Sequence, residues 1–322
     1  MDLDDLIVAA EPNPLLLRID ALCDARQWET LEDLAARCRA ETERGKQLWP
    51  IAEHVEYRLA LQAPGEFAGK VMTADAGRFA LGPLTEVAAS THRYDEVAGW
   101  IKDPTVLGVF AAERVIRGED LTDSARDALE VLELPGRLLD WEDYPLATYK
   151  SDAVEVQAPA LVGSQDGGAA RAGGRFQVDV PSPDVEEALL ALVAEWVSSS
   201  NGQACVSTGN GDLSNWVSSL DGPRRLVETS FQEAATTMAW AAANGGAHGR
   251  RRGAASGRFG TWWALASVFD LEWPIDGRDL FDEASRSRWY WFPPVGATGW
   301  LLCLAVEKPD GGWFAIDAMD SE

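Results

Sequence analysis

Apolar residues recur at a helical spacing through the first 135 residues of the chain. In the segment Trp28–Arg44, for example, Leu31, Leu34 and Cys38 fall three or four positions apart with acidic residues between them, which is the period of an amphipathic helix. Similar segments follow one another, separated by Pro-Gly or Asp-Pro pairs. The pattern predicts an all-α helical array over 1–135, with hairpins like those of HEAT and TPR repeats but no fixed repeat period.

The pattern changes in the last part of the chain, where helical segments alternate with short runs rich in aromatic and β-branched residues. The predicted helices are Val185–Ser198, Ser230–Ala243 and Ala254–Phe269, and the predicted strands are Gln203–Thr208, Arg288–Phe292, Trp300–Glu307 and Trp313–Ala318. Asp212 is placed to cap a further short helix, and residues 309–312 suit the turn of a closing β-hairpin. We therefore expect an α+β domain over 182–322 with a small antiparallel sheet.

The residues between these two parts follow neither period. Segment 136–181 contains several prolines and the Gly- and Ala-rich run 163–174, which has too few apolar side chains to order itself. We predict an irregular linker over 136–181 with a mobile loop at 163–174.

Acidic residues outnumber basic ones in both halves of the chain. Residues 1–150 hold 29 acidic and 16 basic side chains and residues 151–322 hold 23 and 12, for a net charge of −24. A uniformly negative surface repels phosphate backbones and anionic lipids, so we expect neither a nucleic acid nor a membrane as partner. A solvated acidic surface is the simple explanation of this charge, and a surface that attracts a basic protein partner or imitates a nucleic acid is the functional one.

The four cysteines are far apart and form no C-x-x-C pair, which is typical of free thiols in a reducing compartment. The acidic first residues lack the basic start and apolar run of a secretory signal, and no stretch is apolar enough to span a bilayer. We expect a cytoplasmic protein. No spacing typical of a metal site or a cofactor motif is present, so neither a metal nor a cofactor is predicted.

One short segment departs from the acidic background. Residues 244–269 contain four basic residues and no acidic one, and the basic residues are Arg250, Arg251, Arg252 and Arg258. Glycines that precede a helix are typical of anion sites, and arginine adds bidentate donors. We therefore predict an anion- or partner-binding site formed by His248 and the four arginines. The alternative is internal, with the arginines paired to nearby acids such as Asp270 and Glu272 or to the acidic helical array.

Other candidate chemistry has weaker support. The predicted strand 288–292 carries aromatic residues on both faces, so either both faces are buried or Trp289 and Trp291 form an aromatic binding surface. The acidic cluster 140–143 lacks the alternating oxygen ligands and central glycine of a calcium loop. Nothing in the spacing supports a nucleophile pair of Cys205 with the single histidine of the Gly/Arg segment.

The order of a Gly/Arg segment, a Trp-rich helix and a closing hairpin over about residues 238–318 resembles an uncharacterised family of bacterial proteins. The Ala-, Arg- and Asp-rich composition is similar to that of high-GC actinobacterial proteins. The family has no assigned activity, so the resemblance implies no catalytic residue, and it singles out only segment 246–259 as a distinctive element.

The function class that these observations favour is a non-catalytic, cytoplasmic interaction protein. Helical arrays offer long surfaces, and a negative field speeds the encounter with a basic partner. Two alternatives stay open: a protein or enzyme that binds a small anion or nucleotide at 245–258, and an acidic inhibitor or immunity-type protein that blocks a basic active site.

Overall fold

The computed structural model describes residues 3–74, 77, 80–160, 168–169 and 175–321. The chain forms two compact units, and each unit contains two separate stretches of the sequence. Unit 1 comprises 1–137 and 147–156, and unit 2 comprises 138–146 and 157–322. The segment predicted as a linker is therefore shared between the units, and the chain passes from one to the other three times. The loop predicted at 163–174 lies outside the described residues, apart from Gly168–Ala169.

Unit 1 consists mainly of short helices whose apolar faces meet in two clusters. The helices are α1 (Leu3–Ala9), α2 (Pro12–Asp24), α3 (Trp28–Glu43), α4 (Trp49–Gln62), α5 (Gly65–Val71), α6 (Leu84–Ala89), α7 (Tyr94–Val97), the 3₁₀ helix η1 (Ala98–Trp100), α8 (Pro104–Ile116) and α9 (Arg126–Leu129). The first cluster lies among α1–α5 and the second among α4, α6 and α8. Both bury the residues that the helical period places on one face, such as Leu31, Leu34 and Cys38 in the first.

A two-stranded antiparallel hairpin completes unit 1 and comes from the segment 136–181, which was predicted to be an irregular linker. It consists of β1 (Ala147–Tyr149) and β2 (Val154–Val156). The Tyr149 hydroxyl donates a hydrogen bond to the buried Glu86 carboxylate on α6 (2.6 Å), and Tyr57 on α4 donates to the Lys150 carbonyl. The hairpin buries Tyr149 and Ala147 within the second cluster and so belongs to the core of unit 1.

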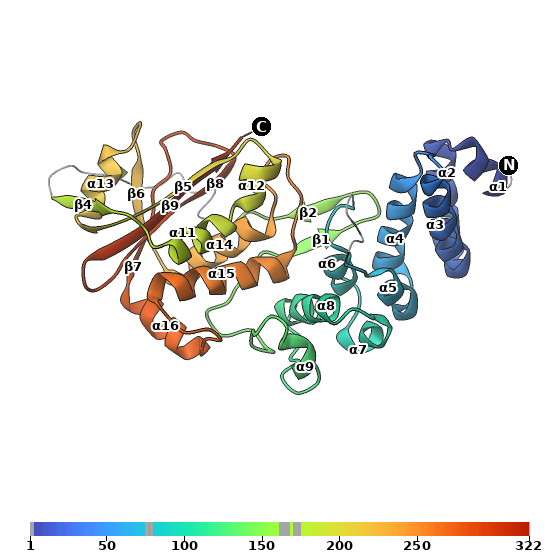
Figure 1. Cartoon of the computed structure of the whole chain (residues 1–322), viewed down its shortest axis with the longest axis horizontal. Coiled ribbons are helices and arrows are strands. Elements are labelled where there is room, and N and C mark those ends of the chain that lie inside the picture. Colours follow the sequence, from blue (N-terminus) through green and yellow to red (C-terminus); the bar gives the residue numbers. More distant parts are fainter. Residues whose placement is uncertain (1–2, 75–76, 78–79, 161–167, 170–174, 322) are drawn as a thin grey trace. The chain divides into compact units, whose positions relative to one another are not determined.

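Unit 2 contains a seven-stranded antiparallel sheet in the order β3-β6-β7-β8-β9-β5-β4. Strands β4 to β9 are labelled in Figure 1. The strands are β3 (Gly168–Ala169), β4 (Phe176–Asp179), β5 (Gln203–Gly211), β6 (Arg225–Thr229), β7 (Arg288–Trp291), β8 (Trp300–Glu307) and β9 (Gly312–Asp320). The predicted strands are present, and β3, β4 and β6 enlarge the small sheet that was expected. These three strands are short and hold few apolar residues, which explains why the sequence pattern did not show them.

Helices cover one face of this sheet. Helices α11 (Pro183–Ala191), α14 (Phe231–Ala243) and α15 (Ala254–Phe269) lie against it, α12 (Ala194–Ser199) contacts β5, and α16 (Gly277–Arg286) packs on α15. Met238 on α14 and Leu265 on α15 lie against Leu304 and Phe314 of the sheet. Of the 16 residues of α15, 11 are buried, so this helix lies in the interior of the unit. The single basic residue of α15, Arg258, is therefore expected to pair with an acidic residue inside the protein.

The opposite face of the sheet carries one short helix, α13 (Leu213–Ser219), which Asp212 caps by accepting a hydrogen bond from the Asn215 N–H (3.2 Å), as predicted. Trp216 on α13 packs on Trp313 of β9, with ring centroids 4.7 Å apart. Farther along β9, the buried guanidinium of Arg224 donates two hydrogen bonds to the Asp317 carboxylate (2.9 and 2.8 Å). This face therefore carries aromatic packing and an ion pair between Arg224 and Asp317.

Helices at the N-terminus followed by an antiparallel sheet region place the protein in the α+β class, as predicted. Within the described residues, no helix combines the length and the apolar character that crossing a bilayer requires.

Candidate functional site

The Gly/Arg segment forms the tight loop between α14 and α15. The backbone N–H groups of Arg252 and Gly253 both donate to the Ala243 carbonyl (2.8 and 3.2 Å) and so close the loop on the end of α14. A Cβ atom on Gly245 would lie 2.1 Å from the backbone of Gly249, so two parts of the loop touch. Glycine is therefore required here by the close approach of the backbone.

This loop does bind a carboxylate, and the carboxylate is the protein's own. The Ala247 N–H donates a hydrogen bond to Oδ2 of Asp320, the last residue of β9 (2.7 Å). Gly246 has a φ of 74°, and a Cβ atom on it would lie 2.1 Å from the same oxygen. The anion that the glycines accommodate therefore comes from the sheet.

The structure removes Arg258 from the predicted anion site. Its side chain is fully buried and forms a bidentate ion pair with Glu142, with Nε–Oε1 2.7 Å and Nη2–Oε2 2.9 Å. The pairing is internal, as the alternative expected, but the partner is not one of the nearby acids Asp270 or Glu272. It lies 116 residues earlier in the sequence.

Among the described residues, Glu142 accepts hydrogen bonds from five donors. Two come from the guanidinium just described. The Trp262 indole and the Tyr144 hydroxyl donate to Oε1 (2.8 and 2.7 Å), and the Leu139 N–H donates to Oε2 (2.9 Å). Burial raises the pKa of Tyr144 well above its usual value, and the Glu142 carboxylate raises it further, so the phenol keeps its proton and remains a donor. This buried network fixes the segment 138–146 against α15.

Three of the other predicted site residues, Arg251, Arg252 and His248, form hydrogen bonds with different partners. Arg251 Nη1 donates to the Asn244 side-chain oxygen (2.6 Å), and Arg252 Nη1 donates to the Ala191 carbonyl (3.3 Å). Arg250 is exposed and is also engaged. His248 is exposed, and its backbone N–H donates to the Ser200 hydroxyl (3.1 Å). Each of these residues already has a contact within the protein.

Trp289 and Trp291 do not form an aromatic surface, because both side chains are buried. The Trp289 ring lies 5.7 Å from that of Phe231, and its indole N–H donates to the Ala284 carbonyl (2.9 Å). The two tryptophans share one face of β7, whereas Arg288 on the other face is exposed and Tyr290 is half-buried, so the alternative of a strand buried on both faces does not hold for β7 either.

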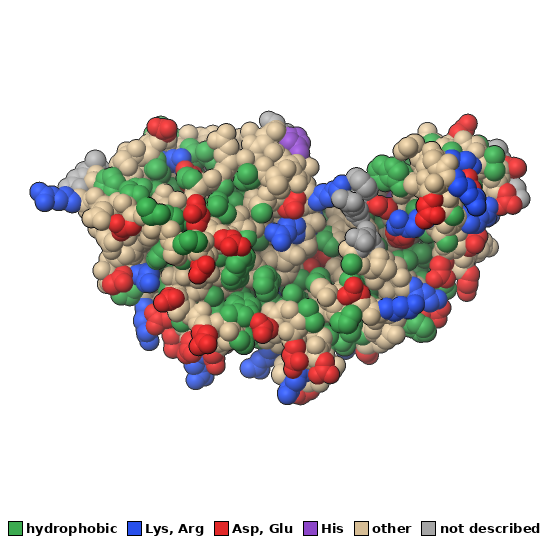
Figure 2. All heavy atoms as spheres, in the orientation of Figure 1, with side chains coloured by type: hydrophobic (Ala, Val, Ile, Leu, Met, Phe, Trp, Pro, Cys, Tyr) green, Lys and Arg blue, Asp and Glu red, His purple; other side chains and the backbone are tan. Residues whose placement is uncertain are grey.

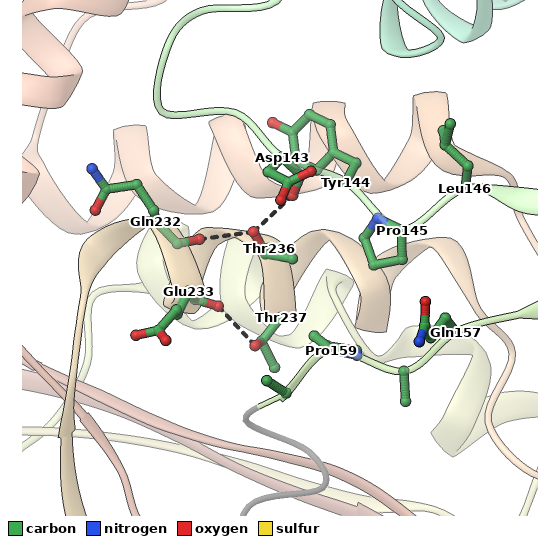
Figure 3. Close-up of a pocket in the computed structure, with 12 residues that line it drawn as sticks. Asp143, Tyr144, Pro145, Leu146, Gln157, Pro159, Gln232, Glu233, Thr236 and Thr237 are labelled. Carbon is green, nitrogen blue, oxygen red and sulfur yellow. Dashed lines mark hydrogen bonds between the residues drawn. The ribbon is translucent and has the colours of Figure 1, made fainter.

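Sequence reasoning missed a cavity of about 690 Å³ in unit 2, which Figure 3 shows in close-up. Its walls come from the segment 143–146, from residues 157–160 and from the first turns of α14. The Thr236 hydroxyl donates a hydrogen bond to the Asp143 carbonyl (2.7 Å) and so joins two of these walls. The one signal in the sequence is the acidic cluster 140–143, of which Asp143 lines the cavity.

The cavity is lined by acidic, amide, hydroxyl and apolar side chains and by no Lys, Arg or His among the described residues. Two carboxylates, Asp143 and Glu233, lie along it. Glu233 Oε2 accepts hydrogen bonds from the Ser230 N–H and hydroxyl (3.0 and 2.8 Å) and from the Thr229 hydroxyl (2.8 Å). These bonds, chiefly the one from the Ser230 backbone, lower the pKa of Glu233, so this wall stays negative near neutral pH.

The remaining lining groups suit a ligand that has both charge and an aliphatic part. Gln157 and Gln232 carry amide groups, and Pro145, Leu146 and Pro159 supply apolar wall. Elsewhere, acidic side chains are scattered over the face seen in Figure 2 and do not gather in one area. Among the described residues, no group of three or more His, Cys, Asp or Glu side chains is placed to hold a metal ion.

Residues 13–317 match the model of a family of unknown function (DUF6183), so the chain belongs to that family. The match covers both units, well beyond the region 238–318 that carries the resemblance in the sequence. No curated protein and no solved structure matches the chain significantly.

Proposed function

We propose that the protein is a non-catalytic binding protein that captures a basic segment of a protein partner in the cavity of unit 2. The observation that supports this most directly is the lining of the cavity, which has two carboxylates and, in the part of the chain that the structure describes, no basic residue. An anionic site in a chain of net charge −24 favours a cationic ligand.

The chemistry of the walls fits a lysine or arginine side chain. Such a side chain lays its aliphatic stem along apolar surface and keeps its charged end near acceptors. Pro145, Leu146 and Pro159 are suitable apolar surface, and Asp143 and Glu233 are suitable acceptors. The volume of about 690 Å³ lies in the range of sites that hold small ligands or a few side chains.

The test is binding of a fluorescently labelled Lys/Arg-rich peptide, compared with a peptide in which every basic residue is replaced by Gln. We expect saturable binding of the basic peptide that weakens as salt is raised from tens to hundreds of millimolar. Asp143→Asn removes one charge from the cavity and should weaken binding about three- to tenfold. Asp282→Asn on α16, an acid outside the cavity, is the matched control and should leave the affinity unchanged. Equal binding of the two peptides, or equal loss in the two variants, would show the proposal to be wrong.

We place this activity in the cytoplasm of a bacterial cell. The four cysteines support the compartment: they are all free thiols, and three are buried, which is typical of proteins kept in reducing conditions. The composition supports the bacterial origin. An inhibitor or immunity-type protein that blocks a basic active site is one form of this proposal, and co-purification with a basic toxin or nuclease would favour it over a scaffold.

A further inference from the structure

Three tryptophans from three elements of unit 2 meet near the end of β9. Trp240 on α14 stacks on Trp300 of β8, with centroids 4.9 Å apart and planes 11° apart. Trp196 on α12 meets both rings edge-on, at 5.8 Å and 6.0 Å. Trp196 and Trp240 are buried, whereas Trp300 is partly exposed, so solvent reaches the cluster at this third ring.

Asp320 lies directly beside this cluster. It is the cross-strand partner of Trp300 in the β8–β9 pair, so the two side chains point to the same side of the sheet. Gly246 touches both neighbours, because a Cβ atom on it would lie 2.1 Å from Asp320 Oδ2 and 3.2 Å from Trp196 Cγ. The carboxylate therefore lies beside Trp300 and against the glycine loop, which also contacts Trp196.

One oxygen of this carboxylate has no partner among the described residues. Asp320 is only 3% exposed, and its Oδ2 accepts the Ala247 N–H. Its Oδ1 is buried, and no donor in the described part of the chain forms a hydrogen bond with it. Buried polar groups are satisfied in most native structures, and a charged oxygen without a donor is costly. The position therefore calls for a donor from outside the described chain.

We propose that Asp320 and the three tryptophans form a binding site for an organic ammonium group. An ammonium N–H supplies the donor that Oδ1 lacks, and its charge balances the carboxylate. The faces of indole rings attract cations, and aromatic cages with a carboxylate suit alkylated ammonium groups. A neutral donor such as an alcohol would satisfy the oxygen but would leave the charge buried.

This site is separate from the acidic cavity, since none of its residues lines that cavity. It also gives the Gly/Arg loop a role that differs from the predicted one. Gly246 and Ala247 hold one oxygen of Asp320 and leave the other unbound. The Gly/Arg loop then positions the Asp320 carboxylate, and this carboxylate binds the cation.

The experiment is an NMR titration of the full chain, in which the indole N–H resonances report on the cluster. The probes are tetramethylammonium, n-butylammonium and N-acetyl-lysine amide, each compared with sodium chloride at the same concentration and with n-butanol as the neutral analogue. We expect saturable shifts of a subset of indole resonances with the ammonium probes, at affinities in the millimolar range or tighter. Strongest binding of the lysine amide identifies a protein side chain as the source of the ammonium group, and strongest binding of tetramethylammonium identifies a free quaternary amine.

Two variants connect the shifts to the site. Asp320→Asn keeps the acceptor for Ala247 and removes the charge, so it should weaken binding at least about tenfold. Trp300→Leu removes the accessible ring and should weaken binding as well, and it keeps the test available if the first variant does not fold. Asp282→Asn should bind the probes as the parent protein does. Absence of saturable shifts in the parent protein, equal shifts with n-butanol, or full binding by both site variants overturns the proposal.

Discussion

Two buried carboxylates in unit 2 have opposite surroundings. Glu142 receives five hydrogen bonds from four residues, and both of its oxygens are saturated. Asp320 receives one, and its second oxygen has no partner among the described residues. A saturated buried ion pair holds two parts of the chain together and has no free bonding capacity. A carboxylate with one oxygen that lacks a donor contributes less to holding the chain together, and that oxygen is available to a ligand. The comparison therefore separates a structural carboxylate, Glu142, from a candidate binding carboxylate, Asp320.

The largest effect is expected from Glu142→Gln. The amide leaves Arg258 without a counter-charge in the interior and turns an N–H₂ group toward a donor, so the free energy of unfolding should fall by about 3–5 kcal/mol. Urea denaturation followed by circular dichroism measures this change. A loss below about 1 kcal/mol would mean that the network does not hold the segment 138–146 in place.

Gly246→Ala should give an intermediate effect. The added Cβ would meet Asp320 Oδ2 at 2.1 Å, and the φ of 74° is unfavourable for alanine. We expect a loss of about 2–3 kcal/mol in the same assay. Gly296→Ala is the matched control, because Gly296 has a φ of 79° and no atom lies within 4 Å of the place that its methyl group would take. It should cost only about 1 kcal/mol, and equal losses at the two glycines would show that contact with the carboxylate is unimportant.

Asp320→Asn should change the free energy of unfolding by less than about 1 kcal/mol. The amide oxygen still accepts the Ala247 N–H, and the burial of an unpaired charge is relieved. The contrast with Glu142→Gln, the same chemical change at the other carboxylate, is the direct test of the comparison. Similar losses in the two variants would show that Asp320 is as firmly built into the structure as Glu142.

The smallest effect concerns pH. The pKa of Glu233 is lowered from its ordinary value of 4.5, chiefly by its bond from the Ser230 backbone. Its contribution to stability is therefore present above the unfolded pKa and is lost as pH falls through the lowered, folded value. Glu233→Gln keeps an acceptor at this helix end and should flatten the acid side of a plot of melting temperature against pH. An unchanged slope below pH 4.5 would contradict the assigned hydrogen bonds.

Local patterns predicted much of the fold. The helix Ala254–Phe269 has the bounds that its composition indicated, and β8 has the bounds of the predicted strand Trp300–Glu307. The predicted helix Val185–Ser198 is divided instead into α11 and α12, because the chain turns at Leu192–Val193 while both side chains stay buried. Hydrophobic periodicity shows which side chains face inward but not where a helix bends.

The partners of charged residues were not predictable. The internal alternative paired Arg258 with nearby acids or with the acidic helical array, but its partner is Glu142, 116 residues away in the sequence. The loop at Gly246 was recognised as suited to an anion, and the Ala247 N–H donates to a carboxylate 73 residues later, that of Asp320. Long-range pairing depends on how the segment 138–146 and the sheet are placed, and no local pattern records that placement.

The division of each unit into two stretches has a consequence for how the protein can be cut. A break between residues 137 and 138 separates unit 1 from its hairpin, and a break between 156 and 157 leaves the larger part of unit 2 without Glu142 and Tyr144. No single cleavage at these connections yields two complete folded pieces. A cut at either of these two connections leaves one unit whole and removes part of the other, and of the three connections only the one between residues 146 and 147 divides both units at once when it is cut.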